Sequence, residues 1–175
     1  MPSYKPNSMA KIFTKTGDQG ETCRLDGKRA PKNDPLVELY GTLDECNSIL
    51  GIARSFNTDA QLDLPLKQLQ NLLLVPLPKL GTADVQTLEK LIDQREAQLP
   101  KLGNFILPAG GTVSAHLHLA RTTARKAERR LATLRETEEV NPVASAWLNR
   151  LSDALFVLAR TAAHQAGNGD ETANP

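Results

Sequence analysis

The sequence predicts an all-α protein, a five-helix antiparallel bundle, on three observations. Leu and Ala are abundant, which favours packed helices. Aromatic residues make up only 4% of the 175 residues, fewer than a β-sandwich core normally uses. Apolar residues also recur at steps of three and four in five separate segments, and this spacing places them on one face of a helix. Short connections between such helices favour antiparallel neighbours.

The first two helices have clear starts and stops. Asp34 followed by Pro35 is typical of an N-cap and a first helical position. The apolar face that follows consists of Leu36, Leu39, Leu43, Cys46, Leu50 and Ala53. The second helix is expected over residues 62–74, and Pro76 ends it because proline lacks the N–H that an interior helical residue donates. Its apolar face consists of Leu62, Leu66, Leu69 and Leu73.

The remaining three helices follow at similar spacing. The third is expected from Thr82 to about Leu99, before Pro100. The fourth has the strictest apolar repeat, which consists of Leu117, Ala120, Ala124, Ala127, Leu131 and Leu134. The pair Asn141–Pro142 caps the fifth. Its apolar face consists of Ala144, Leu148, Leu151, Leu155, Leu158 and Ala162.

The bundle domain is assigned to residues 11–165, between a flexible extension at 1–10 and a disordered tail at 166–175. A net charge of +1 argues against a general nucleic-acid binder. The chain lacks both a run of about 18 apolar residues and the apolar start of a secretory signal, so we expect a cytoplasmic protein. Cys23 and Cys46 do not have a metal-binding spacing and are expected to be reduced thiols.

The fourth helix carries a row of arginines along one face. These arginines are spaced four residues apart: Arg121, Arg125 and Arg129. Glu128 borders the row, and Lys126 and Arg130 widen the basic surface, so that one acid stands among five bases. An ordinary solvated face is the alternative interpretation. The unbalanced guanidinium groups nevertheless suit a polyphosphate, because each binds oxygen pairs through two hydrogen bonds.

The loop TKTGDQGET, which begins at Thr14, is the natural companion of these arginines. Its threonines and glycines supply hydroxyl and backbone donors, and Asp18 is suited to hold Mg²⁺ directly or through water. The loop is not a Walker A motif, because GxxxxGK[ST] is absent. Lys32 follows closely enough to serve the same phosphates. An exposed turn is the alternative interpretation.

Three further positions each allow either a functional or a purely structural interpretation. Asn149, which shares a helix face with Asp153, is suited to phosphate or metal, or to a polar helix–helix seam. Asp44 is suited to pair with an arginine of the fourth helix, or to face solvent. Phe105, in the loop NFILPAGG, is suited to wall a flat apolar ligand, or to fill the core. No histidine is assigned a role, since His116 and His118 point in different directions from one helix.

These residues lie in seven segments that resemble, in the same order, the PduO-type cobalamin adenosyltransferases. The segments are KIFTKTGDQGET, GKRAPKNDP, YGTLDECNS, LEKLIDQ, NFILPAGG, ARTTARKAERRL and LNRLSDALFVLAR. The resemblance covers residues 11–56 and 85–165. It implies a five-helix bundle that assembles as a homotrimer, with each active site between two subunits.

The resemblance also implies roles for individual residues. Those expected to wrap the ATP phosphates are Thr14, Lys15, Thr16, Gly17, Asp18, Thr22 and Lys32. Those expected to bind ATP from the last two helices are Arg125, Glu128, Arg129 and Asn149. Arg121 and Asp44 match a pair that forms a salt bridge across the subunit interface, and with Arg125 and Asn149 they are the expected catalytic residues. Phe105 matches the aromatic residue that closes the lower face of the corrin ring.

The implied reaction transfers the 5′-deoxyadenosyl group of ATP to the cobalt of cob(I)alamin and releases tripolyphosphate. ATP and cobalamin are the substrates, and Mg²⁺ accompanies the triphosphate. Because Co(I) is itself a strong nucleophile, the protein needs alignment and charge stabilisation rather than a general base. Hand-off of the product to an adenosylcobalamin-dependent enzyme is a further expectation.

The chain departs from the family pattern at three places. Lys126 stands where many members have arginine, and Cys23 replaces a residue that is usually Ser. The stretch QNLLLVPLPKLGTADV is shorter than usual, which calls the packing of the bundle and the trimer contacts into question. Two other functions are compatible with parts of the pattern: a corrinoid carrier, and a different ATP-dependent transferase without a P-loop.

Overall fold

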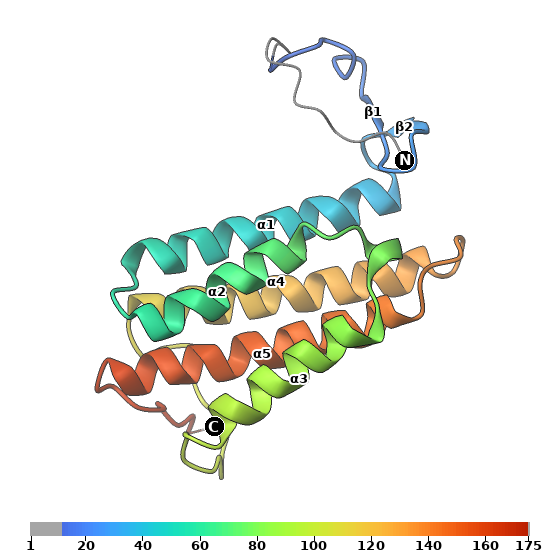
Figure 1. Ribbon diagram of the computed structural model, residues 1–175. Coiled ribbons are helices and arrows are strands. Elements are labelled where there is room, and N and C mark those ends of the chain that lie inside the picture. Colours follow the sequence, from blue (N-terminus) through green and yellow to red (C-terminus); the bar gives the residue numbers. More distant parts are fainter. Residues whose placement is uncertain (1–11, 175) are drawn as a thin grey trace.

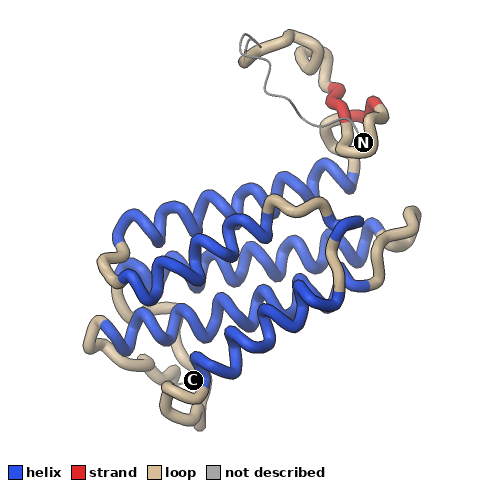
Figure 2. The backbone as a smooth tube through the Cα atoms, in the orientation of Figure 1, coloured by secondary structure: helices blue, strands red, loops and turns tan. Residues whose placement is uncertain are grey.

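The computed structural model describes residues 12–174, and these residues confirm the all-α class with five α-helices (Figure 1). The helices are α1 (Pro35–Phe56), α2 (Ala60–Leu73), α3 (Thr82–Glu96), α4 (Thr112–Leu134) and α5 (Val143–Gln165). A hairpin of two short antiparallel strands, β1 (Glu21–Cys23) and β2 (Arg29–Pro31), precedes them (Figure 2). The flexible extension expected at residues 1–10 lies outside the described residues.

Successive helices alternate in direction, so the bundle is antiparallel as predicted (Figure 1). Helix α4 packs against α1 and α5, α3 packs against α5, and α2 covers α1. All six apolar positions predicted for α4 are buried. Three of them, Ala120, Ala124 and Ala127, are small and therefore let the neighbouring helices approach closely.

Helix α5 is more deeply buried than its amphipathic pattern predicted. Its expected apolar face is buried, but so are Trp147, Ser152 and Arg160, which the predicted face did not include. The reason is that α5 packs against both α3 and α4. A helix enclosed on several sides becomes a central element rather than a surface helix.

The helix boundaries follow local capping chemistry. The Asp34 carboxylate accepts hydrogen bonds from the backbone N–H groups of Leu36, at 2.9 Å, and Val37, which confirms the predicted N-cap of α1. Asp59 caps α2 in the same way and starts it two residues before the predicted position. Helix α3 ends at Glu96, before the predicted Leu99, because the N–H groups of Gln98 and Leu99 bond to carbonyls three residues back instead of four, and Leu99 itself precedes a proline.

The short connection between α2 and α3 is packed into the bundle. It contains a single 3₁₀ turn, Leu77–Lys79, and buries Leu77 and Leu80 in the core. The Tyr40 hydroxyl accepts a hydrogen bond from the Leu77 N–H at 3.1 Å. The Asn141 side-chain amide donates to the carbonyls of Leu77 and Leu80 at 3.0 and 2.8 Å. The reduced length therefore leaves the packing of this end of the bundle intact.

The C-terminal segment, predicted to be disordered, is instead hydrogen-bonded to the rest of the chain as far as Ala173. Asp170 forms an ion pair with the buried Arg160. Thr172 forms an antiparallel bridge with Ile106. Sequence reasoning missed both contacts because each joins polar or loop residues that have no periodic pattern. Within residues 12–174, no helix is long and apolar enough to cross a membrane.

Candidate functional site

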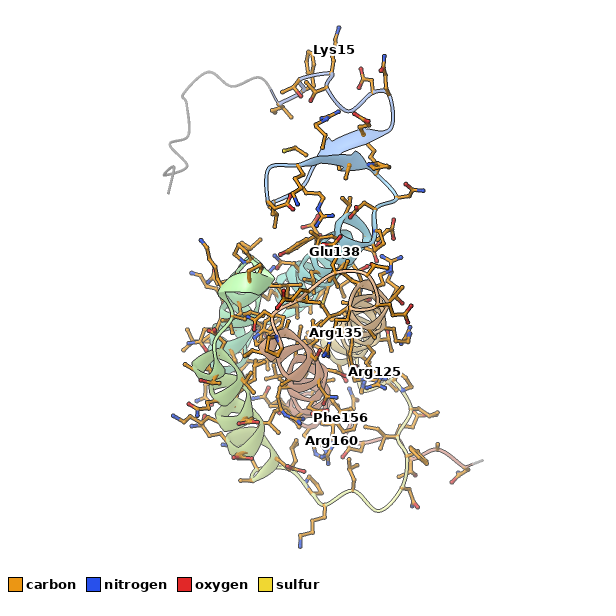
Figure 3. The ribbon with its side chains drawn as sticks, turned by 90° about the vertical axis from the view of Figure 1, so that its right-hand side faces the viewer. Lys15, Arg125, Arg135, Glu138, Phe156 and Arg160 are labelled. Atoms are coloured by element: carbon orange, nitrogen blue, oxygen red, sulfur yellow. The ribbon has the colours of Figure 1, made fainter. Side chains whose placement is uncertain are left out.

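The TKTGD loop stands at the outer end of the projecting hairpin (Figures 1 and 3). The hydroxyls of Thr14 and Thr16 lie 2.8 Å apart. Lys15 has a φ of 59°, an uncommon conformation for a residue other than glycine, asparagine or aspartate. The Asp18 N–H donates to the Lys15 carbonyl at 3.4 Å, which closes a turn. The turn leaves the side chains of Thr14 to Asp18 largely exposed to a ligand.

The hairpin brings Lys32 back to this loop, as its position in the sequence suggested. The Lys32 N–H donates to the Gly20 carbonyl at 2.8 Å. A Cβ at Gly17 would lie 3.6 Å from the Lys32 ammonium, so this charge lies directly beside the turn. Thr22, on β1, lines a hollow of ≈ 320 Å³ between the hairpin and α1. Asp44 lines the same hollow.

The basic surface around the arginine row of α4 is narrower than the sequence indicated. Lys126 forms an ion pair with Glu45 of α1. Arg130 pairs with Glu38 of the same helix at 2.7 Å. Both side chains therefore join α1 to α4 and balance charge there. The row of Arg121, Arg125 and Arg129 remains as the available cationic surface.

A polar contact joins this row to α5. The Asn149 side-chain amide donates to a Glu128 carboxylate oxygen at 3.2 Å. The other Glu128 oxygen lies 3.7 Å from an Arg125 guanidinium nitrogen. Arg129 in turn donates to the Arg125 carbonyl at 3.1 Å. The structure thus brings the predicted residues of α4 and α5 together in one connected group.

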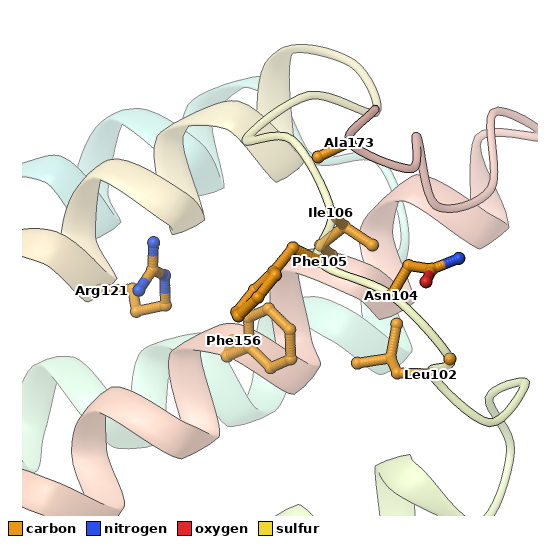
Figure 4. Close-up of a pocket in the computed structure, with 8 residues that line it drawn as sticks. Leu102, Asn104, Phe105, Ile106, Arg121, Phe156 and Ala173 are labelled. Carbon is orange, nitrogen blue, oxygen red and sulfur yellow. The ribbon is translucent and has the colours of Figure 1, made fainter. Parts of the chain in front are cut away.

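Arg121 links the arginine row to an apolar pocket of ≈ 690 Å³ (Figure 4). The side chains of Phe105, on the loop before α4, and Phe156, on α5, form part of the opposite wall. Burial lowers the pKa of Arg121, and the neighbouring positive charge of Arg125 lowers it further. The Arg121 Nε atom is buried without a hydrogen-bond partner among the described residues. This guanidinium is therefore suited to an anionic or polar ligand group.

Phe156 is a site residue that sequence reasoning missed. It lies seven positions after Asn149 and three after Asp153, so it continues the polar face of α5 that the sequence had marked. In LNRLSDALFVLAR it stands among apolar residues, so nothing in the sequence set it apart as a site residue. His118 of α4 meets its ring edge-on, with the ring centres 6.0 Å apart. Phe105 is exposed rather than in the core, so of the two interpretations the structure favours the pocket wall.

Within one chain, the predicted site residues lie in two separate places. Lys15 lies at one extreme of the molecule, and Arg125 lies on the body of the bundle (Figure 3). Asp44 has no ion-pair partner within residues 12–174, and the partner expected for it, Arg121, is that of another subunit. The same residues contain no cluster of three His, Cys, Asp or Glu side chains that would hold a metal ion.

The comparisons with known proteins agree with these features. The family model described as cobalamin adenosyltransferase matches residues 12–162. The chain is 36% identical to the corrinoid adenosyltransferase MMAB of Homo sapiens over 189 aligned positions, which cover 97% of this chain and 76% of the human protein. It is 39% identical to a corrinoid adenosyltransferase of Citrobacter freundii over 166 positions, which cover 87% of this chain and 94% of that protein.

A solved structure has the same fold. It is that of a variant PduO-type ATP:corrinoid adenosyltransferase from Lactobacillus reuteri complexed with cobalamin and ATP. It matches with a TM-score of 0.86 and 33% identity, over 94% of this chain and 97% of that one. The helical bundle, the residues on it and these matches together show that the chain belongs to the cobalamin adenosyltransferase family.

Proposed function

We propose that this protein transfers the 5′-deoxyadenosyl group of ATP to the cobalt of cob(I)alamin, forming adenosylcobalamin and releasing tripolyphosphate. The observation that carries the proposal is the position of Arg121, between the cationic row of α4 and the apolar pocket. A polyphosphate and a large flat apolar ring require these two environments side by side. Membership of the family, and the ATP and cobalamin bound to its relative, support the assignment.

In this proposal the two phosphate-binding parts enclose the triphosphate. Thr14 to Asp18, with Thr22 and Lys32, supply hydroxyl, backbone and ammonium donors. Arg125 and Arg129 supply guanidinium groups, while Glu128, which accepts a hydrogen bond from Asn149, helps to position Arg125. The negative charge on the leaving tripolyphosphate increases as the C5′–O bond breaks. Fixed cationic donors lower the barrier because they stabilise this charge without reorganising.

The pocket holds the corrin ring of the second substrate against Phe105 and Phe156. The rings exclude water and a lower axial ligand, which makes reduction of Co(II) to Co(I) easier. The Co(I) electron pair attacks the ribose C5′, the new Co–C bond forms, and the C5′–O electron pair leaves with tripolyphosphate. Proton abstraction plays no part, because Co(I) is itself the nucleophile. The protein contributes alignment of the reacting atoms.

Mg²⁺ fits this site as a companion of the triphosphate. The described residues do not offer an all-protein cage, and Mg²⁺ commonly binds through substrate phosphates with one or two carboxylates. Asp18 is the carboxylate of the loop suited to that role. When bound, Mg²⁺ neutralises part of the phosphate charge.

A homotrimer with active sites between subunits accounts for the separation of the two parts. The hairpin carries the loop away from the arginines of its own chain (Figure 3), and the apolar residues Phe13 and Leu25 beside it are exposed. A neighbouring copy would cover these side chains and supply the arginines. It would also allow Asp44 to pair with Arg121 of another subunit. A cytoplasmic location and hand-off to an adenosylcobalamin-dependent enzyme complete the proposal.

The test is direct. The protein is incubated with Mg·ATP and chemically reduced cobalamin, and the corrin spectrum is followed together with tripolyphosphate release. We expect adenosylcobalamin and tripolyphosphate in equal amounts. Binding of cobalamin without transfer would indicate a carrier instead, and phosphate release without a Co–C bond would indicate a different ATP-dependent transferase.

A further inference from the structure

The chain reverses sharply after α5 and returns along the end of the bundle. Gly167 and Gly169 have φ angles of 75° and 65°, values that favour glycine. The N–H groups of Asn168 and Gly169 both donate to the Ala163 carbonyl, at 3.0 and 3.3 Å. This C-terminal turn directs residues 170–173 toward the loop that carries Phe105 (Figure 4).

A buried ion pair fixes the start of this segment. Arg160 is only 2% exposed, and its Nε and Nη2 atoms donate to the Asp170 carboxylate at 3.0 and 2.8 Å. His164 lies 3.0 Å from the same carboxylate. These contacts hold the pKa of Asp170 below its ordinary value, chiefly through the hydrogen bonds from Arg160. The same arginine donates to the Pro100 carbonyl at 2.7 Å, at the entrance of the loop.

The segment then pairs with the loop through its backbone. The Leu107 N–H donates to the Glu171 carbonyl, and the Ala173 N–H donates to the Phe105 carbonyl, both at 2.8 Å. Ile106 and Thr172 form the antiparallel bridge between these two bonds. Within residues 12–174, every hydrogen bond from residues 100–109 to another part of the chain runs to Arg160 or to this segment.

The loop therefore depends on the tail for its position. Phe105 is 87% exposed, so its own burial does not fix the backbone beneath it. The pocket walls nevertheless include Leu102, Phe105 and Ile106 from the loop and Ala173 from the tail. A wall built on two segments paired through their backbones holds its shape before the ligand arrives, which reduces the entropy lost on binding.

We propose that Asp170 is a positioning residue for the corrinoid substrate: anchored by Arg160, it holds residues 170–173 against the Phe105 loop and presets the pocket wall. This inference rests on the proposed function of the pocket. It assigns a binding role to a segment that touches neither the arginine row nor the TKTGD loop.

The experiment compares Asp170→Ala with Asp63→Asn. The control removes the negative charge from another Arg–Asp pair of similar geometry, between Arg54 and Asp63 at 2.8 Å, and neither of these residues lines the pocket. In Asp170→Ala we expect the KM for cob(I)alamin to rise by roughly tenfold, as ordering of the loop must now accompany binding. The KM for ATP should stay at the wild-type value, and Asp170→Glu should recover part of the loss. An unchanged cobalamin KM would overturn the inference.

Ala173→Pro provides a second variant if Asp170→Ala folds poorly. Proline removes the N–H that bonds the Phe105 carbonyl and leaves the Arg160–Asp170 pair in place. We expect the same selective rise in the KM for cob(I)alamin. Equal rises for both substrates would point to a general loss of structure and would also contradict a positioning role.

Hydrogen exchange separates this inference from the proposed function. The Leu107 amide should exchange slowly in the wild-type protein and in Asp63→Asn, and much faster in Asp170→Ala. Absence of adenosyl transfer in the wild type would reject the proposed function. Equal Leu107 exchange in all three proteins would instead show that Asp170 does not hold residues 170–173 against the loop.

Discussion

At the scale of single residues, the charge of Arg125 is available to a ligand, whereas the charges of nearby basic residues are used in ion pairs between helices. Its side chain is half exposed, and its contact with Glu128, at 3.7 Å, is long. An exposed pair of this kind contributes about 1 kcal/mol or less to stability. Its neighbours Lys126 and Arg130, in contrast, are paired with acids of α1. Arg125 therefore contributes mainly to the cationic surface for a ligand.

We predict that Arg125→Ala lowers kcat/KM for adenosyl transfer by about 10²–10³-fold, the loss typical of removing one donor to a developing negative charge. The melting temperature should change little. Arg135→Ala is the matched control, because Arg135 caps the same helix and donates to Ser145 away from the site. Near-normal activity of Arg125→Ala would show that the triphosphate binds elsewhere.

His118 gives the molecule a pH-dependent contribution to stability. Burial lowers its pKa, as does the charge of Arg121 on the same helix, while Asp170 of the C-terminal segment acts in the opposite direction. Because the folded-state pKa lies below the unfolded one, the unfolded chain takes up the proton first on acidification. The stabilising effect of neutral His118 is complete above its ordinary pKa and is lost as the pH falls toward the folded value.

We therefore predict that the melting temperature falls as the pH drops below the ordinary histidine pKa of about 6.5, and that the fall is smaller in His118→Gln. His116→Gln is the control, since His116 lies on the same helix but is only partly buried, with its ring stacked on Phe56 and a ring nitrogen at the Thr112 carbonyl. Equal slopes in wild type and His118→Gln would mean that another group carries the pH dependence.

At the scale of elements, the short connection between α2 and α3 is fixed by core packing and by hydrogen bonds from Asn141. Two leucines fill the core, and Asn141 satisfies two of the link's carbonyls from the α4–α5 connection. The same Asn141 side chain accepts from the Val143 N–H at the start of α5. One residue thus joins two connections at one end of the bundle.

We predict that Asn141→Asp destabilises the protein by about 1–3 kcal/mol, since two partly buried carbonyls lose their donor while the capping oxygen remains. At about 2–4 °C for each kcal/mol, calorimetry should show a clear fall in melting temperature. Asn71→Asp, at an exposed position of α2, should leave it almost unchanged. A stable Asn141→Asp protein would mean that Leu77 and Leu80 alone hold the link.

At the scale of the whole molecule, the distance between the TKTGD loop and the arginine row leads to a prediction about assembly. Light scattering should give a mass three times that of the 19.1 kDa chain. A monomer at micromolar concentration would contradict the proposed trimer.

Mixing two inactive variants tests whether subunits share a site. Lys15→Ala damages the loop, and Arg125→Ala damages the arginine row. Trimers reassembled from equal amounts of both should have intact sites at about a quarter of their interfaces, where the good loop of one chain meets the good row of another. No recovered activity would favour a site within one chain.

Much of the fold was predictable because helix formation is read from local spacing. The six apolar positions of α4 all proved to be buried, and Asp34 caps α1 as its neighbour Pro35 suggested. Helix ends were less certain, as the early end of α3 shows. Pairing such as that of residues 171–173 with the loop that carries Phe105 depends on partners distant in sequence, so polar composition alone did not reveal it.

The sequence by itself determined the five helices, their buried faces and the chemical groups available for a phosphate. These properties depend on the spacing of residues within one segment. The tertiary structure alone decided that Phe105 and Phe156 line the same pocket, that Lys126 and Arg130 bind acids of α1, and that residues 171–173 pair with the loop that carries Phe105. Each of these contacts joins segments far apart in the chain, and only the packing of the helices brings such segments together.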